Sequence, residues 1–151
     1  MLEIGDLEQL QQLVGSEVAV SDWLAVEQRQ VDQFAEATGD RQWIHVDVER
    51  SKRELPYGGT VAHGFLTLAL LPRFFSESIR MSGVRMLVNY GLNRVRFPAP
   101  LPVGCRVRGR LKLLALADIP GGVEMTWEVT VEREGESKPV CVAETIFRRY
   151  P

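Results

Sequence analysis

The sequence predicts an α+β fold in which a long antiparallel sheet wraps around one apolar helix. Residues 64–79 form the most apolar segment of the chain, and their leucines recur at helical spacing. From residue 85 onward the apolar period changes to two, which is typical of strands with one buried face. A single apolar helix followed by a long sheet buries its surface best when the sheet covers it.

The composition is that of an ordinary globular protein, with 45% hydrophobic and 25% charged residues among 151. This length allows a substantial core, so we expect residues 1–151 to form a single domain. The net charge of −2 gives no electrostatic argument for a nucleic-acid partner. No apolar run approaches the roughly 18–20 residues of a membrane helix, so no membrane partner is expected either.

Two features favour a cytoplasmic protein. The N-terminal segment carries Glu3, Asp6 and Glu8 where a secretory signal would be basic and then apolar. The cysteines, Cys105 and Cys141, lie far apart in strand-like segments and form no CxxC motif. They are interpreted as small buried thiols, while a disulfide between them stays open from the sequence.

The first third of the chain alternates helices with extended segments. Apolar residues at helical spacing before Gly15 predict a short helix over residues 7–14, and residues 16–25, rich in Val, Trp and Leu, predict a strand. A second helix is predicted over residues 28–38, because Gly39 just beyond it can take the left-handed conformation that ends a helix. Asp40 therefore leaves that helix at a sharp turn, on a loop.

The apolar helix is preceded by polar and turn-forming residues. Residues 49–54 are charged and predict a solvated helical turn or a loop, and residues 55–60 contain Pro56, Gly58 and Gly59 and predict a turn. Residues 64–79 are apolar on nearly all sides, which predicts a buried helix whose core includes Phe65 and Leu66. Pro72 interrupts it and is expected to kink or offset the half from residue 73 onward.

Four long antiparallel strands are expected in the second half. Residues 86–90 are apolar and residues 93–97 alternate, a proline-rich bend follows at 98–104, and three further alternating segments occupy 106–113, 123–132 and 140–150. Glu134-Gly135-Glu136 predicts a hairpin turn. Because short turns join neighbouring segments, an antiparallel sheet is expected, and a long sheet wrapped around one helix is the hot-dog fold.

The segment from Thr38 to Phe65 carries the residues with chemical potential, including both histidines, His45 and His63. Asp40, His45 and the helix start at Gly64 supply a carboxylate, an imidazole and free backbone donors, the groups needed to move a proton beside a carbonyl. Simpler interpretations stand beside this one. Asp40 after a helix-ending glycine is often only a turn residue, and His45 can be a satisfied core histidine.

This segment resembles the hydratase motif of the MaoC-like dehydratases, the (R)-specific enoyl-CoA hydratases. The residues that match the motif are Phe34, Thr38, Gly39, Asp40, Ile44 and His45. The block Ala62-His63-Gly64 is similar to the start of that family's central helix, and Asn89–Phe97 resembles a strand pair of the branch related to the nodulation protein NodN. The similarity covers roughly Trp23 to Phe147, and it departs from the pattern at Gln42-Trp43, where classical members have Asn-Pro.

The resemblance implies an enzyme of fatty acid metabolism that hydrates a 2-enoyl thioester or dehydrates the (R)-3-hydroxyacyl thioester. Asp40 and His45 would hold one water and share the acid–base work, and the N–H of Gly64 would bind the thioester oxygen. His63, Gly59 and Trp43 complete the expected oxyanion and substrate-binding group, with His63 hydrogen-bonded near the helix start rather than catalytic. No metal and no cofactor are implied.

The implied partners are a coenzyme A or acyl carrier protein thioester and a second copy of the chain. A homodimer is expected because hot-dog sheets pair edge to edge, and the acyl group is expected in an apolar channel beside the central helix. The carrier, the acyl chain length and the physiological direction stay open.

Other chemistries are less well supported. The spacing of Asp40 and the histidines is poor for zinc, and neither a Gly-x-Ser-x-Gly elbow nor a dinucleotide fingerprint is present. Alternating arginines at 106, 108 and 110 predict a solvated strand face, with coenzyme A phosphates as the alternative ligand. Two alternative functions stay open: a hot-dog thioesterase, in which Asp40 directs water at the carbonyl carbon, and a non-catalytic acyl-thioester binding subunit.

Overall fold

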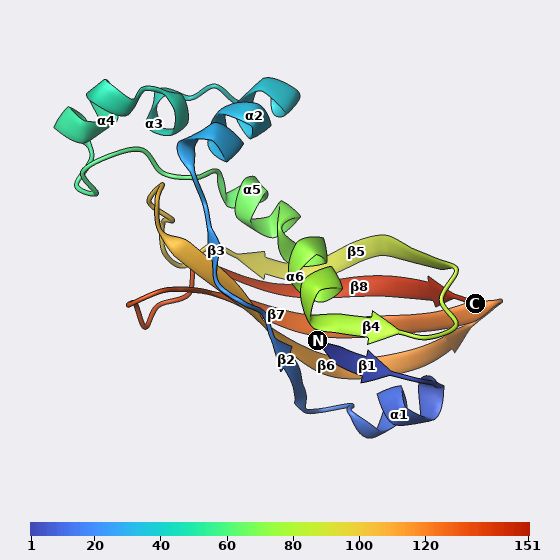
Figure 1. The fold of residues 1–151 in the computed structure, drawn as a ribbon. Coiled ribbons are helices and arrows are strands. Elements are labelled where there is room, and N and C mark those ends of the chain that lie inside the picture. Colours follow the sequence, from blue (N-terminus) through green and yellow to red (C-terminus); the bar gives the residue numbers. More distant parts are fainter.

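A six-stranded sheet and two consecutive helices dominate the computed structural model, which describes all residues 1–151 (Figure 1). The strand order is β2-β6-β7-β8-β5, and β3 also pairs with β6. The helices α5 (Gly64–Ala69) and α6 (Leu71–Ser78) lie across one face of this sheet. The predicted α+β hot-dog fold is confirmed.

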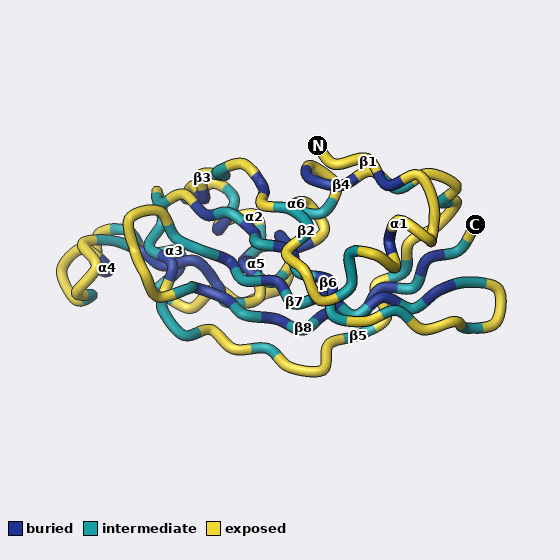
Figure 2. Tube along the Cα trace, turned by 90° about the horizontal axis from the view of Figure 1, so that it is seen from below, coloured by how far each residue is buried: buried dark blue, intermediate teal, exposed yellow.

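The three central strands form the core because their side chains alternate between buried and half-buried positions. They are β6 (Arg106–Ile119), β7 (Gly122–Arg133) and β8 (Cys141–Tyr150), and each is antiparallel to the next. Buried positions on these strands are filled by large apolar side chains such as Trp127, which has no exposed surface. Figure 2 shows this alternation along β7 and β8 and the more exposed path of β5.

The strand β5 (Met86–Arg96) lies beside β8 at the sheet edge opposite β2. The expectation that neighbouring segments pair throughout is therefore wrong for β5, since residues 97–105 carry the chain across to β6 at the other side. The strand pair expected in Asn89–Phe97 is not found in the structure. That segment belongs to one strand that stays continuous through two register shifts, between Asn89 and Gly91 and between Leu92 and Arg94.

The predicted central helix is divided at Leu70 into α5 and α6, with Pro72 in the first turn of α6, as the sequence predicted. Its second half packs closely on the sheet, because Phe74 contacts β6 where Gly109 has no side chain. The expectation of burial on all sides is wrong, since Phe65 is 69% exposed and Ala69 is also exposed. The sheet covers only one flank of the helices, and the flank towards β5 stays open in the single chain.

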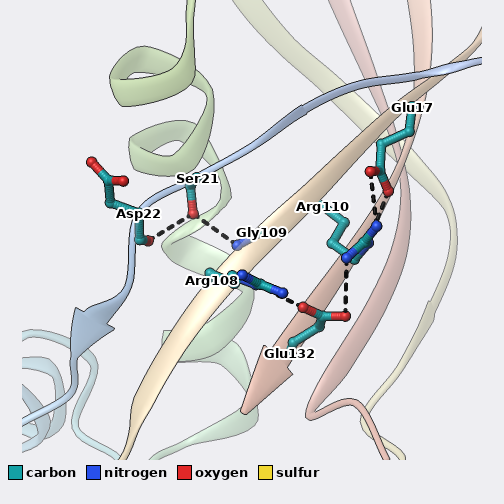
Figure 3. A network of polar contacts seen from close by, with 7 residues as sticks. All are labelled: Glu17, Ser21, Asp22, Arg108, Gly109, Arg110 and Glu132. Carbon is teal, nitrogen blue, oxygen red and sulfur yellow. Dashed lines mark hydrogen bonds and ion pairs between the residues drawn. The ribbon is translucent and has the colours of Figure 1, made fainter. Parts of the chain in front are cut away.

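The predicted strand 16–25 forms two short strands, β2 (Glu17–Val20) and β3 (Leu24–Ala25), both paired with β6. They are interrupted at Ser21, whose buried hydroxyl accepts the N–H of Gly109 at 2.9 Å and donates to the Asp22 carbonyl (Figure 3).

The arginines of β6 lie on the outer face of the sheet and are paired with glutamates. Arg110 contacts both oxygens of Glu17 at 2.8 Å and also approaches Glu132, which accepts from Arg108 (Figure 3). Arg106 is paired with Glu134 in the same way. Since carboxylates already engage all three guanidinium groups, the structure favours a paired surface row over a coenzyme A phosphate site.

Three further helices gather at one end of the molecule, above the start of α5 (Figure 1). They are α2 (Gln28–Thr38), α3 (Trp43–Val46) and α4 (Val48–Glu54). The short helix α1 (Leu7–Gln12) also matches its prediction. A parallel pair, β1 (Leu2–Ile4) with β4 (Ile79–Met81), was not predicted.

The two cysteines are free thiols in different surroundings. Cys141 is fully buried in β8, and burial raises the pKa of its thiol to about 11. Cys105 is only half-buried and lies just before β6, so its assignment to a strand is wrong. None of the helices combines the length and hydropathy that a membrane crossing requires.

Candidate active site

Asp40 is positioned by the end of α2. Gly39 has φ +79°, so the chain turns sharply as the helix stops, and the hydroxyl of Thr38 accepts the N–H of Asp40 at 3.3 Å. The Asp40 side chain is exposed, and its Oδ1 accepts the N–H of Gln42 at 3.4 Å. This contact is the kind that a turn residue makes, as the simpler interpretation of Asp40 expects. The other carboxylate oxygen has no protein partner.

His45 lies in α3, a single turn that begins directly after Gln42. His45 is 7% exposed, and its Nδ1 is 2.6 Å from the carbonyl oxygen of Val61. Because a carbonyl only accepts, Nδ1 carries the proton and Nε2 presents a lone pair. The departure at Trp43 does not prevent this arrangement, since Trp43 is the first residue of α3 and the His45 N–H still reaches the Gln42 carbonyl at 2.9 Å.

His63 links the Asp40 loop to the start of α5. It is 2% exposed, and its Nε2–H donates to the backbone carbonyl of Asp40 at 2.9 Å. Its ring stacks on His45 with centroids 3.8 Å apart and planes 24° apart. The buried Nδ1 of His63 has no partner, so the neutral Nε2–H tautomer is the form that avoids an unpaired buried N–H.

Three groups therefore meet that are separated along the chain. One ligand atom each of Asp40, His45 and His63 lies within 4.8 Å of the other two. The stacking makes this a poor metal site, because imidazole lone pairs lie in the ring planes and two stacked rings do not direct them to one ion. The arrangement suits a proton-handling site, in which a neutral imidazole and a carboxylate face the same small volume.

Burial sets the electrostatics of His45. Desolvation lowers the pKa of its imidazole below the ordinary 6.5, and the neighbouring His63 lowers it further. The bond to Val61 and the charge of Asp40 act in the opposite direction but are outweighed. His45 is thus neutral near pH 7 and can accept a proton at Nε2.

Gly64 begins α5 next to this cluster. Its N–H has no acceptor within the chain, as expected for the first residue of a helix. A side chain at this position would approach the ring of Phe97 to 3.1–3.2 Å, so packing by itself favours glycine here. The helix has only six residues and breaks at Leu70, so its dipole contributes less than that of the long helix that was predicted.

Two predicted site residues are not brought into this cluster. The indole of Trp43 lies under the guanidinium of Arg50, with the guanidinium carbon 4.0 Å from the ring centroid. Gly59 belongs to the loop before buried Thr60, and a side chain there would meet nothing within 4 Å. The substrate-binding role expected for these two residues therefore stays a prediction.

Gln28, at the start of α2, is a site neighbour that the sequence did not reveal. Its amide nitrogen donates to the His45 carbonyl at 2.7 Å and to Asp32 at 2.9 Å, and its oxygen accepts from the Thr60 hydroxyl at 2.5 Å. The amide thus ties α2 to the segments that hold His45 and lead to Gly64. A glutamine at a helix start carries no sequence signal for such a role.

Comparison with known proteins agrees with this architecture. The model of the family described as "MaoC like domain" matches residues 9–134. The chain is 53% identical over 135 residues to 3-hydroxyacyl-thioester dehydratase Z of Mycobacterium tuberculosis (strain ATCC 25618 / H37Rv), covering 89% of each protein. It is 46% identical over 136 residues to Nodulation protein N of Rhizobium leguminosarum bv. viciae, covering 88% of this chain and 84% of that protein.

A solved structure supports the fold independently. The (R)-hydratase from A. caviae involved in PHA biosynthesis superposes with a TM-score of 0.72 at 18% identity, covering 91% of this chain and 96% of that one. With a family model matched across most of its length and a relative above half identity, the chain belongs to the MaoC-like domain family.

Proposed function

We propose that this chain is a hydro-lyase that interconverts 2-enoyl thioesters and (R)-3-hydroxyacyl thioesters. The observation that carries the proposal is the convergence of Asp40, His45 and His63, the last of which directly precedes the unpaired N–H of Gly64 at the start of α5. The name of the Mycobacterium tuberculosis relative, a 3-hydroxyacyl-thioester dehydratase, supports the same reaction for this chain.

The water is activated between two acceptors. A water held by a carboxylate oxygen of Asp40 and Nε2 of His45 donates one hydrogen to each, so its lone pair points away from both, towards the substrate. As the water oxygen bonds to the β-carbon, one of the two groups takes a proton from the water. That protonated group then gives the proton to the α-carbon and returns to its starting form, so that one water has been added across the double bond. Each positioned acid–base group contributes about 10²–10⁴ in rate.

The thioester oxygen carries the charge that develops during this addition. When the β-carbon is attacked, the electron pair of the double bond moves into the carbonyl and an enolate forms. In this proposal the N–H of Gly64, which has no acceptor within the chain, donates to that oxygen, and a preorganised donor of this type is worth about 10²–10³ in rate. In dehydration the same groups act in reverse, and the hydroxyl leaves as water.

The active form is proposed to be a cytoplasmic homodimer in which residues 1–151 act as one domain. β5 is an edge strand with exposed apolar residues, including Leu87 at 52% and Tyr90 at 55%. Pairing of two such edges would satisfy their free backbone groups and cover these side chains. Two free thiols agree with a reducing compartment. The thioester carrier is coenzyme A or an acyl carrier protein.

Product analysis tests the reaction. Purified protein is incubated with crotonyl-CoA and with an enoyl-CoA of medium length, and the enoyl absorbance, the free thiol and the chirality of the 3-hydroxyacyl product are followed. The proposal requires loss of absorbance, an (R)-configured product and no free thiol. Release of free thiol would indicate a thioesterase, and binding of every thioester without turnover would indicate an acyl-thioester binding subunit.

A further inference from the structure

The backbone of Asp40 is held from two directions. Its N–H donates to the hydroxyl of Thr38 at 3.3 Å, a local contact at the end of α2. Its carbonyl accepts the Nε2–H of His63 at 2.9 Å, across 23 positions of the chain. No backbone N–H reaches this carbonyl, so His63 is its only partner within the chain. The placement of the Asp40 carboxylate therefore depends on a long-range bond as well as on the local turn.

The ring of His63 is fixed in the orientation that this bond needs. It stacks on His45 with centroids 3.8 Å apart, and Phe34 packs against it at 4.9 Å with the planes inclined by 55°. The residue is also buried, so close packing restricts rotation of the imidazole. Because Phe34 lies on α2, the helix that ends just before Asp40, the ring contact and the hydrogen bond both fasten α2 to the start of α5.

The segment 61–64 contacts or contains each group of the proposed site. The Val61 carbonyl accepts the Nδ1–H of His45 at 2.6 Å. Two residues later, His63 donates to the Asp40 carbonyl. The next residue is Gly64, whose N–H has no acceptor within the chain. This short segment thus sets where the imidazole, the carboxylate and the free backbone donor lie relative to one another.

We propose that His63 is a positioning residue for the hydration reaction, which acts through Asp40 by holding its loop at a fixed distance from Gly64. The inference rests on the proposed function, in which water adds to the β-carbon while the Gly64 N–H binds the thioester oxygen. The substrate fixes the separation of these two atoms, so the protein groups must match it. A displacement of about 1 Å can cost about 10²-fold in rate. His63 itself transfers no proton in this role.

A purely structural role for His63 makes a different prediction. The residue also begins α5, because its backbone carbonyl accepts the N–H groups of Leu66 and Thr67 at 3.1 and 3.2 Å. These backbone bonds are available to any side chain at position 63, whereas the bond to Asp40 needs a side-chain donor. If the ring only fills space between α2 and α5, an apolar side chain of similar size should support the same activity as a donor.

A matched pair of side chains separates the two roles. Glutamine and methionine are both unbranched and similar in size, but only glutamine carries an N–H donor near the place of Nε2. His63→Met is expected to lower kcat by about 10- to 100-fold with KM changed by less than about threefold, using the enoyl-CoA that the native protein hydrates fastest. His63→Gln should restore most of that loss. The melting temperatures of the two variants are compared, so that a loss of fold is recognised.

A double-mutant cycle tests whether His63 acts through Asp40. Once Asp40→Asn has removed the carboxylate, its position no longer matters, so adding His63→Met should lower kcat by less than about twofold further. Equal kcat values in His63→Met and His63→Gln, or independent losses that multiply in the double variant, would overturn the role of His63 and leave the hydratase function intact. Absence of hydration by the native protein would contradict the proposed function, and this inference with it.

Discussion

His45 has a surrounding that fixes both its tautomer and its charge. The Val61 carbonyl requires a proton on Nδ1, and burial lowers the pKa of the ring, so Nε2 is free to accept a proton at neutral pH. The His63 ring stacked on His45 lowers the pKa of His45 further. Burial, with a smaller contribution from His63, thus keeps His45 in its neutral form.

The pH dependence of hydration follows from this shift. The folded-state pKa of His45 lies below 6.5, so the active neutral form persists as the pH falls through 6.5. The acid limb of kcat/KM is expected to have its midpoint below 6.5, measured between pH 5 and 9. Because folding lowers the pKa of His45, its neutral form stabilises the folded protein fully at any pH above the pKa that His45 has in the unfolded chain. This stabilisation is lost as the pH falls from that value through the folded-state pKa. A midpoint above 6.5 would contradict the assignment.

Gln28 is predicted to position His45 through the backbone. Gln28→Glu removes the amide donors to the His45 carbonyl and to Asp32 and adds a negative charge nearby. We expect kcat to fall by about tenfold with little change in KM, and the acid limb to move upward because a negative charge raises the pKa of a histidine. Gln33→Ala, an exposed change on the same helix, serves as the control. If the variant lost thermal stability along with kcat and its pH profile did not move, Gln28 would have a structural role only.

At the residue scale, the sequence located the proposed catalytic pair better than the residues around it. Asp40 follows a helix-ending glycine and His45 follows at short range, so local signals located both. The stacking of His45 on His63 and the amide of Gln28 join segments that are far apart in sequence. Such contacts depend on how α2, α3 and α5 pack against one another, and the spacing of apolar residues in the sequence does not predict that packing.

The start of α5 is shaped by packing as well as by chemistry. Gly64 touches the ring of Phe97, which in turn packs edge-on against Phe65 with centroids 6.2 Å apart. Gly64→Ala is expected to displace this ring and to lower kcat/KM by about tenfold, since overpacking of this type costs about 1–3 kcal/mol. Phe97→Leu in the same chain should restore most of the loss. Activity that stays low in the double variant would instead mean that the methyl group blocks the thioester directly.

At the element scale, propensity located the helices and strands but not all of their partners. The bounds of α2 match the prediction because Gly39 is an unambiguous stop, and Pro72 correctly marked the break between α5 and α6. The pairing of β5 with β8 was missed because a proline-rich connection hides a crossover that only the sheet reveals. The sequence did not predict the exposed flank of α5. Apolar residues on all sides of a helix indicate burial, but in the single chain no other element covers that flank.

At the scale of the whole molecule, the long edge strand β5 has no neighbour on its outer side, and a second copy of the chain is expected there. If two β5 edges pair, light scattering should give twice the chain mass of 17.0 kDa. Tyr90→Glu places a charge on each edge and is expected to shift the protein to monomers, because like charges facing each other across paired strands are destabilising. Tyr57→Glu, at another exposed tyrosine outside the sheet, should stay dimeric. A native monomer, or equal dissociation of both variants, would contradict pairing through β5.

The central claim is that Asp40 and His45 act as one unit on a single water beside Gly64. Its most direct test is the hydration rate of Asp40→Asn, His45→Gln and the double variant, each with circular dichroism to verify the fold and with exposed Asp22→Asn as a control. Each single change should lower kcat by about 10²–10⁴. The kcat of the double variant should be little lower than that of either single variant, because removing one member of a pair that acts as a unit already removes the effect of the other. Independent, multiplying losses, or a single variant that retains native activity, would contradict a shared water.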